Sequence, residues 1–362
     1  MALEDLLFRS TNYQHMVKGT TSGLELLSVS DARAHYSSYF SKANLTVGIA
    51  GNYTREYMGS LLSELEKLPV INATIAPAGK ARSANGITVE IISKDNALGS
   101  AVFTGFPLQL TRRSDEFAAL MVANSWLGEH RKSYSRLYQK IREARSMNYG
   151  DYSYIEWYNN GGQNMLPSPG YPRTSNYFSI WLRPVQTAEG LKKQYPELSS
   201  ITVGHAHFAI RMALRELQLL IDNGMTQEDF ELTRNFLRSY MKLYAQTPGK
   251  QLGFLMDSKF YGRTNYLGDM DAALAKLTLA DVNQAIKRHW QTENMYITIV
   301  TDDSEAEPLK KSLLENTVSP MSYSNALKAT LPEAILKEDD IVAKYPLKIG
   351  QVTIVPAEKM FQ

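Results

Sequence analysis

Arg142 and Tyr149, seven residues apart, are the pair in this sequence whose types and spacing could do chemistry. A guanidinium presents a rigid fork of donors that can hold carbonyl or carboxylate oxygens. A phenol can donate its hydroxyl to an oxygen that gains negative charge during a reaction. Such a pair is also common by chance, since an arginine on a solvated helix face and a tyrosine packed in a core have the same spacing.

The residues around the pair predict a helix followed by a strand. Leu137, Ile141 and Ala144 recur at steps of four and three, which is typical of an amphipathic helix. The following residues have a period of two, typical of an aromatic strand: Tyr152, Tyr154, Glu156 and Tyr158 alternate with Ser153, Ile155 and Trp157. The arginine should therefore lie near the end of the helix and the tyrosine where the strand begins. Functional side chains are often found at such junctions.

Composition limits the classes of protein that this chain can belong to. Its 362 residues are 44% hydrophobic and 21% charged, which is typical of a globular protein with two or three domains. The net charge of +2 and the scattered basic pairs, such as Arg112-Arg113, predict solvated faces and no nucleic-acid partner. No apolar run reaches the roughly 18 residues of a membrane span. The absence of cysteine excludes disulfides, thiol catalysis and cysteine-bound zinc.

The first region of the chain predicts a helix, a strand and a second helix. Ser28 is the expected N-cap of the first helix, with Asp31 placed to complete a capping box. Residues 45–50 alternate as a strand, and Thr54 caps the second helix. From residue 69 to residue 86 the composition shifts to Ala, Pro, Gly, Asn and Ser, which indicates a linker between domains.

The second region predicts more strands and a series of helices. It opens with a strand pair, residues 87–94 and 100–106, joined by a turn. A helix capped by Ser114 follows, and a long loop over residues 159–176 comes after the Arg–Tyr junction. Residues 177–185 form the next strand.

Further along, long helices dominate the pattern. One helix is expected over residues 200–223 and another from residue 226 to a stop at Pro248. A helix, a strand and a helix follow in residues 278–316. Beyond residue 320 the sequence shows little periodicity, apart from residues 351–355, and a tail is predicted there.

An internal repeat links the two regions. Residues 26–50 align without a gap with residues 276–300, and the cap, helix, break and strand coincide. The matched positions include Leu27 and Leu277, Asp31 and Asp281, Phe40 and Trp290, and Asn44 and Asn294. The repeat predicts an α+β fold made of duplicated sheet-plus-helices domains, the first copy truncated and the second complete.

Three passages give this arrangement its resemblance to a known family. They are N-Y-Q-H-M-V-K-G-T-T with the helix and strand that follow it, the linker, and L-Y-Q-K-I-R-E-A-R-S-M-N-Y-G. Together they resemble the pitrilysin/insulinase family of zinc metallopeptidases, the inverted zincins, whose domains are of the LuxS/processing-peptidase-like type. The resemblance implies a first-domain remnant in residues 1–72, a linker in 73–86, a complete second domain in 87–318 and a C-terminal tail in 319–362.

The resemblance also implies a role for the Arg–Tyr pair. Arg142 and Tyr149 fall on the motif whose arginine and tyrosine reach across to the active site of the family's first domain. Tyr149 would stabilise the scissile carbonyl or its oxyanion, and Arg142 would hold substrate carbonyls or a carboxylate. Both are therefore candidate catalytic residues of a peptide hydrolase, with a peptide or unfolded polypeptide as the expected substrate.

The family's H-x-x-E-H metal motif is not present. His205 and His207 are two residues apart on opposite sides of an expected helix, and His15 is expected to be structural. This chain alone is therefore expected to hold no metal and to be inactive. Zinc is expected for a longer parent protein, whose ligands would lie upstream.

Two other functions stay open. The protein could be a non-catalytic partner or scaffold subunit of a heterodimeric peptidase of the same family, or a non-enzymatic α+β interaction module. A homo- or heterodimeric state is compatible with the resemblance. The compartment is open, and the bacterial periplasm is suggested only by the resemblance.

Overall fold

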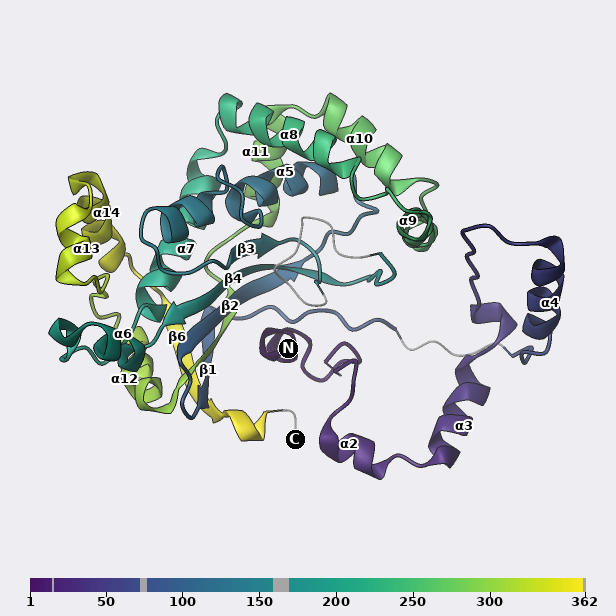
Figure 1. Cartoon of the computed structure of the whole chain (residues 1–362), viewed down its shortest axis with the longest axis horizontal. Coiled ribbons are helices and arrows are strands. Elements are labelled where there is room, and N and C mark those ends of the chain that lie inside the picture. Colours follow the sequence, from purple (N-terminus) through teal and green to yellow (C-terminus); the bar gives the residue numbers. More distant parts are fainter. Residues whose placement is uncertain (15, 72–76, 159–168, 361–362) are drawn as a thin grey trace.

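A six-stranded mixed sheet forms the centre of the molecule (Figure 1). The computed structural model describes residues 1–14, 16–71, 77–158 and 169–360. The strand order is β3-β4-β2-β5-β1-β6; β1 runs parallel to β5 and β6, and the other neighbours are antiparallel. The strands are β1 (Ile87–Lys94), β2 (Gly99–Leu108), β3 (Asp151–Tyr154), β4 (Asn176–Gln186), β5 (Met295–Asp302) and β6 (Ile349–Pro356).

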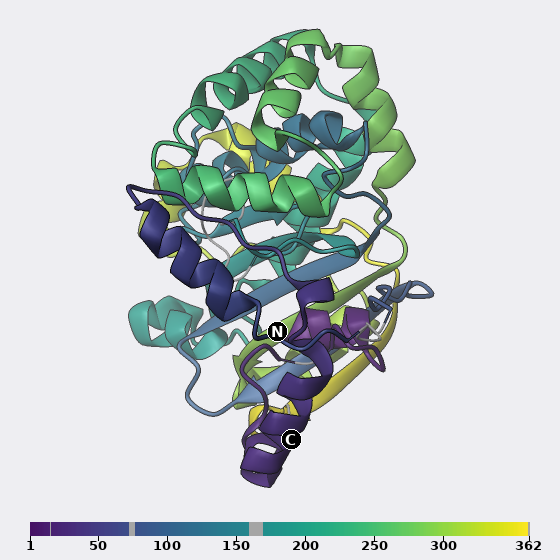
Figure 2. The same cartoon turned by 90° about the vertical axis from the view of Figure 1, so that its right-hand side faces the viewer.

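Helices cover one face of the sheet, and α1 lies on the opposite face (Figures 1 and 2). On the first face α5, α7 and α12 contact the strands, while α8, α10 and α11 pack on α5. The helices are α1 (Ala2–Phe8), α2 (Thr21–Leu26), α3 (Val29–Tyr39), α4 (Arg55–Leu65), α5 (Phe117–Gly128), α6 (Ala188–Gln194), α7 (Ala206–Asn223), α8 (Gln227–Met241), α9 (Pro248–Phe260), α10 (Tyr266–Lys276), α11 (Leu279–His289), α12 (Asp303–Leu314), α13 (Asn325–Thr330) and α14 (Glu333–Ala343), with short turns η1 (Lys42–Asn44), η2 (Tyr138–Glu143), η3 (Pro196–Leu198) and η4 (Ala357–Lys359).

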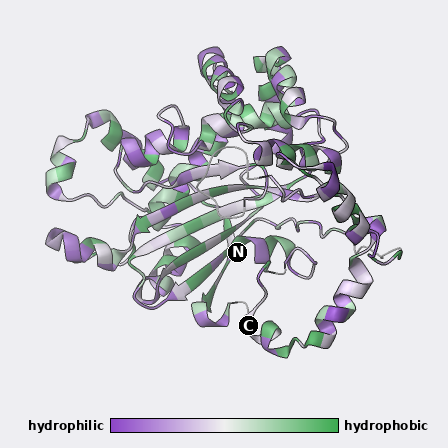
Figure 3. Ribbon diagram, turned by 45° about the vertical axis from the view of Figure 1, so that its right-hand side comes forward, coloured by the Kyte–Doolittle hydropathy of each residue, from purple (hydrophilic) through white to green (hydrophobic). Residues whose placement is uncertain are grey.

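The two faces of the sheet bury different sets of side chains. Figure 3 shows hydrophobic residues gathered along the strands. Toward the helices, side chains such as Val89 and Ile297 belong to one continuous core. On the other face, Leu7 and Phe8 of α1 are fully buried in a smaller cluster that includes Tyr177. The sheet is therefore covered on both sides, and the α+β class predicted from the sequence is confirmed.

The predicted hairpin between β1 and β2 is wrong, because β5 lies between these strands. The connecting residues turn at Asn96, whose φ is +57°. The Ala97 N–H donates to Asp302 Oδ2 at the end of β5, 3.0 Å away. The turn was predicted at the right residues. It crosses the end of β5, a strand that begins about 200 residues later, at Met295.

The start of α8 was predicted more accurately than its end. Gly224, with a φ of +71°, follows α7, and the Thr226 side chain accepts the Asp229 N–H at the start of α8. However, α8 ends at Met241, and Pro248 begins α9 instead of ending α8. Proline suits the first position of a helix because its missing N–H would have no partner there.

The last residues contribute to the sheet. Residues 319–362 were expected to form a tail, but they carry α13, α14 and β6. Strand β6 pairs in parallel with β1, and Val352 lies opposite Val89. Val342 of α14 is fully buried. The sheet of the second region therefore includes a strand from the expected tail.

The repeat is visible in the helices and absent from the strands. Helices α3 and α11 both begin with a complete capping box, Ser28 with Asp31 and Thr278 with Asp281. Residues 45–50 form no strand, so that prediction is wrong, and the described residues contain one sheet instead of two. The copy in β5 is held by hydrogen bonds to strands on both sides. Among the described residues, the first copy has no such neighbours.

Candidate functional site

Arg142 and Tyr149 lie against each other at the surface. The Arg142 Nη2 donates to the Tyr149 hydroxyl oxygen over 2.8 Å. The guanidinium carbon is 4.1 Å from the centroid of the tyrosine ring, which is cation–π contact. Tyr149 is 58% exposed, so its ring and hydroxyl are accessible to a ligand. The structure therefore brings the two predicted site residues together.

The turn that carries Arg142 is a π-helix instead of the predicted α-helix. It covers Tyr138–Glu143, and the Ala144 N–H donates to the Gln139 carbonyl five residues back. The buried side chains of Leu137 and Ile141 anchor it to the core, as the apolar spacing predicted. Such π-turns are rare and occur frequently at functional sites.

The backbone that follows Tyr149 is fixed from two sides. The Tyr152 hydroxyl donates to the Tyr149 carbonyl over 3.0 Å, and its ring stacks on His130. Gly150 lies so close to β4 that a Cβ there would sit 2.1 Å from the Arg183 carbonyl oxygen. The Arg183 N–H donates to the Gly150 carbonyl over 2.9 Å. Only glycine fits this approach, and it places the tyrosine at the edge of the sheet.

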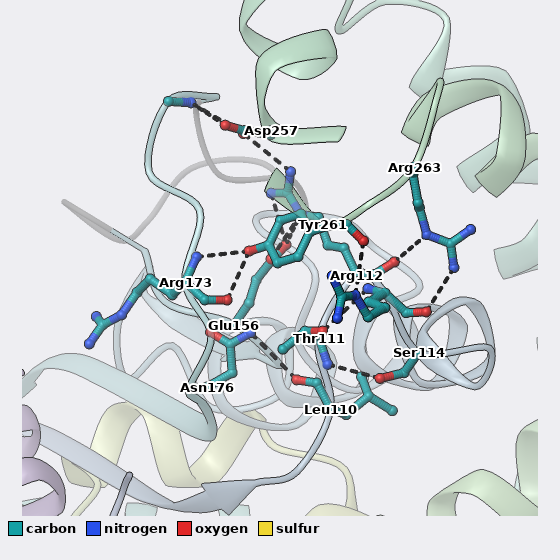
Figure 4. Close-up of polar contacts among 12 residues, drawn as sticks. Leu110, Thr111, Arg112, Ser114, Glu156, Arg173, Asn176, Asp257, Tyr261 and Arg263 are labelled. Carbon is teal, nitrogen blue, oxygen red and sulfur yellow. Dashed lines mark hydrogen bonds and ion pairs between the residues drawn. The ribbon is translucent and has the colours of Figure 1, made fainter. Parts of the chain in front are cut away.

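The strand after the pair is shorter than predicted, since β3 ends at Tyr154. The chain then turns so that Glu156 reaches Arg112, whose Nε donates to Glu156 Oε2 over 2.9 Å (Figure 4). Both side chains are buried, so the expectation that Arg112 belongs to a solvated basic pair is wrong. Burial raises the pKa of Glu156, and the Arg112 charge opposes that rise.

The Arg112 cluster ties distant segments together (Figure 4). Asp257 of α9 lies 3.6 Å from Arg112 Nη1 and accepts the Gly170 N–H over 3.0 Å. The Tyr261 hydroxyl accepts the Arg173 N–H over 2.9 Å. These residues are separated by up to about 150 positions, so no spacing in the sequence could have predicted the cluster.

His205 and His207 do not form a zinc site. His205 Nε2 lies 3.0 Å from the Ser322 carbonyl oxygen, and His207 Nδ1 lies 3.2 Å from Ser312 Oγ. Burial lowers the pKa of both, that of His207 to about 3. Within the described ranges no three metal-ligating side chains gather. The prediction for His15 lies outside the described residues. The described residues therefore do not fit the zinc that the resemblance implies.

Membrane insertion through a helix finds no support in the part of the chain that the structure describes. None of its helices combines the length and apolar character needed to cross a bilayer.

The fold is that of peptidase-type domains of known structure. A peptidase M16 inactive domain from Pseudomonas fluorescens is 17% identical, with a TM-score of 0.64 over 83% of this chain and 64% of that chain. The periplasmic protease PqqL from Escherichia coli is 14% identical, with a TM-score of 0.54 over 95% and 34%. A chain of complex III2 from Candida albicans is 11% identical, with a TM-score of 0.59 over 82% and 64%. The chain thus spans less than two thirds of each of these three structures.

Part of the sequence is similar to a family model of the same group. Residues 27–180, which include Arg142 and Tyr149, match the family described as the peptidase M16 inactive domain. This match and the solved neighbours confirm the resemblance to the pitrilysin/insulinase peptidases. Among curated proteins, none matches this sequence.

Proposed function

We propose that this chain is the substrate-binding and transition-state-stabilising portion of a zinc-dependent metalloendopeptidase. In this proposal the zinc ligands lie in another part of a longer parent protein, and Arg142 and Tyr149 complete its active site. The supporting observation is the Arg142–Tyr149 contact, a bonded and exposed pair held by a buried scaffold. The M16 match covers both residues.

The hydrogen bond between the two side chains favours donation by the tyrosine. Arg142 donates to the Tyr149 oxygen, so the phenolic hydrogen can point toward a ligand. That hydrogen would stabilise a peptide carbonyl or the negative charge that develops on its oxygen. The remaining guanidinium donors would hold a second carbonyl or a carboxylate of the substrate.

The proposal includes the domain division predicted from the sequence. Residues 1–72 would belong to a first, catalytic-type domain, 73–86 to a linker and 87–318 to the second domain. Closure of two such domains around a peptide would supply the pair only when the site is shut.

A peptide-hydrolysis assay on the zinc-loaded parent tests the proposal. Tyr149→Phe should slow hydrolysis, while Tyr57→Phe, at a tyrosine that is 56% exposed on α4, should not. Equal rates for the Tyr149→Phe variant and the unmodified parent would count against the assignment.

The matching family is described as an inactive domain, which favours a second candidate. In it the parent is the non-catalytic partner of a heterodimeric peptidase and donates the pair in trans. The likeness to a chain of complex III2 agrees with a role inside an assembly. The parent alone would then be inactive, and adding a zinc-bearing partner subunit would restore hydrolysis that depends on Tyr149. A periplasmic location is proposed from the likeness to PqqL, and fractionation of cells tests it.

A further inference from the structure

A buried carboxyl group follows the Arg–Tyr pair in the chain, two residues after Tyr149. Asp151, the first residue of β3, has no exposed surface and lies opposite Leu182 of β4. Ser153, two residues on, donates its hydroxyl to the Asn124 carbonyl of α5 over 3.1 Å. Side chains two residues apart in a strand share a face. The Asp151 carboxyl therefore points toward the helix layer and away from solvent.

Neither oxygen of this carboxyl accepts a hydrogen bond from the described residues. Burial raises the Asp151 pKa to about 8, even though Asn148 and the charge of Arg142 lower it. The Asn148 side chain acts on this carboxyl, but among the described residues its amide has no partner at hydrogen-bond geometry. A buried carboxyl without a proton or a donor is strongly unfavourable, so Asp151 must obtain one of the two.

Arg142 offers the complementary unsatisfied group. Its outer nitrogen, Nη2, is bonded to Tyr149, but its inner nitrogen, Nε, is buried and has no acceptor among the described residues. The guanidinium therefore reaches from the exposed tyrosine to the interior, and its charge acts on the Asp151 carboxyl. Among the described residues, Arg142 Nε thus lacks an acceptor and the Asp151 carboxyl lacks a donor. The two residues are nine positions apart in the sequence.

We propose that Asp151 is the buried counter-ion of Arg142 and a positioning residue for the Arg–Tyr pair. The Arg142 Nε–H is directed at the Asp151 carboxylate, either directly after a small side-chain rotation or through one bridging water. The functional meaning of this contact rests on the proposed function above.

A guanidinium held at its inner edge cannot rotate freely. Because the group is planar, fixing Nε also fixes the plane in which the outer nitrogens meet Tyr149 and a ligand. Charge-assisted hydrogen bonds of this kind orient functional side chains in many sites. Without Asp151, the Arg142 guanidinium would keep its charge, but the orientation of its plane would no longer be fixed.

Side-chain NMR of the arginine Nε–H groups in the full chain tests the contact without any activity. The Arg142 signal is assigned by its loss in Arg142→Lys. We expect this Nε–H to exchange slowly with water in the unmodified chain and rapidly in Asp151→Asn. Ser153→Ala, on the same face of β3, is the matched control. It removes a buried hydrogen bond to α5 and should leave the Arg142 signal unchanged.

Three results would overturn the proposal. One is an Arg142 Nε–H signal that is unaffected by Asp151→Asn. The second is rapid exchange of that Nε–H in the unmodified chain, a result that does not depend on whether the variant folds. The third is an Asp151 pKa that stays near 8 when its carboxyl carbon chemical shift is followed against pH, because a hydrogen bond from Arg142 must lower that pKa.

Kinetics of the zinc-loaded parent separate this proposal from the proposed function. If both hold, Asp151→Asn should raise KM about tenfold with a smaller change in kcat, the effect of losing one charge-assisted hydrogen bond. Tyr149→Phe should instead lower kcat. A silent Tyr149→Phe defeats the proposed function and leaves the NMR result standing. A lowered kcat in Tyr149→Phe with an unchanged KM in Asp151→Asn defeats the positioning role alone.

Discussion

At the scale of single residues, the site depends on which polar groups are exposed and which are buried. Tyr149 is mostly exposed, whereas the nearby Asp151 has no exposed surface at all. Arg142 connects the two environments. The outer groups can therefore meet a ligand, and the buried ones can only orient their neighbours.

The first prediction concerns Tyr149→Phe and Arg142→Lys in the zinc-loaded parent. Tyr149→Phe removes one hydroxyl and almost no volume, so kcat and kcat/KM should fall together by about a hundredfold. Arg142→Lys keeps the charge but loses the planar fork, so KM should rise. Steady-state kinetics with a peptide substrate measure both. A change confined to the melting temperature would instead assign both residues to packing.

The second prediction concerns the buried histidines and pH. Burial lowers the pKa of His207 to about 3, so below the ordinary value of 6.5 the unfolded chain binds a proton that the folded chain does not. The free energy of unfolding should therefore fall as the pH drops from 6.5 toward 3, by up to about 1.4 kcal/mol per pH unit from this group. His207→Gln should flatten that slope in urea titrations at several pH values. His35→Gln, at an exposed position of α3, should not.

At the scale of elements, local signals were predictable and long-range ones were not. The caps at Ser28 and Thr54 form as predicted, because each needs only a side chain and an N–H three residues away, whereas Ser114 does not cap α5. The π-turn under Arg142 and the early end of β3 were missed. The π-turn depends on packing against the core, and the end of β3 depends on the contact between Glu156 and Arg112.

The third prediction tests the close approach at Gly150. A methyl group there would collide with the Arg183 carbonyl oxygen, so Gly150→Ala must push β3 away from β4. We expect a loss of about 1–3 kcal/mol of stability and a weakened Arg142–Tyr149 contact. Urea unfolding and the Arg142 NMR signal report on the two effects. Gly59→Ala, in α4, meets no atom within 4 Å and serves as the control.

At the scale of the whole molecule, the order of the strands decides what the sequence can reveal. The α+β class, the repeat of the capped helix and the position of the Arg–Tyr pair were available from periodicity and spacing. The insertion of β5 between β1 and β2, and the pairing of β6 with β1, were not. These pairings join residues more than 180 positions apart, and no local pattern records them.

The fourth prediction concerns the docking of α1 on the sheet. Phe8 has no exposed surface and packs against Tyr177 and beneath the guanidinium of Arg173. Phe8→Ala should cost about 3–5 kcal/mol of unfolding free energy and expose this face of the sheet. Hydrogen exchange of β2 and β5 amides should rise in the variant. Val17→Ala, at a side chain that is 85% exposed, should change neither quantity.

The position of β1 has a consequence for synthesis on the ribosome. Both of its neighbours, β5 and β6, lie near the C-terminal end of the chain, so β1 leaves the exit tunnel long before either. During that interval its unpaired backbone N–H and C=O groups and its apolar side chains are open to other nascent chains. A chaperone that shields residues 87–94 until residue 356 has emerged would therefore raise the yield of folded protein more than it changes the final stability.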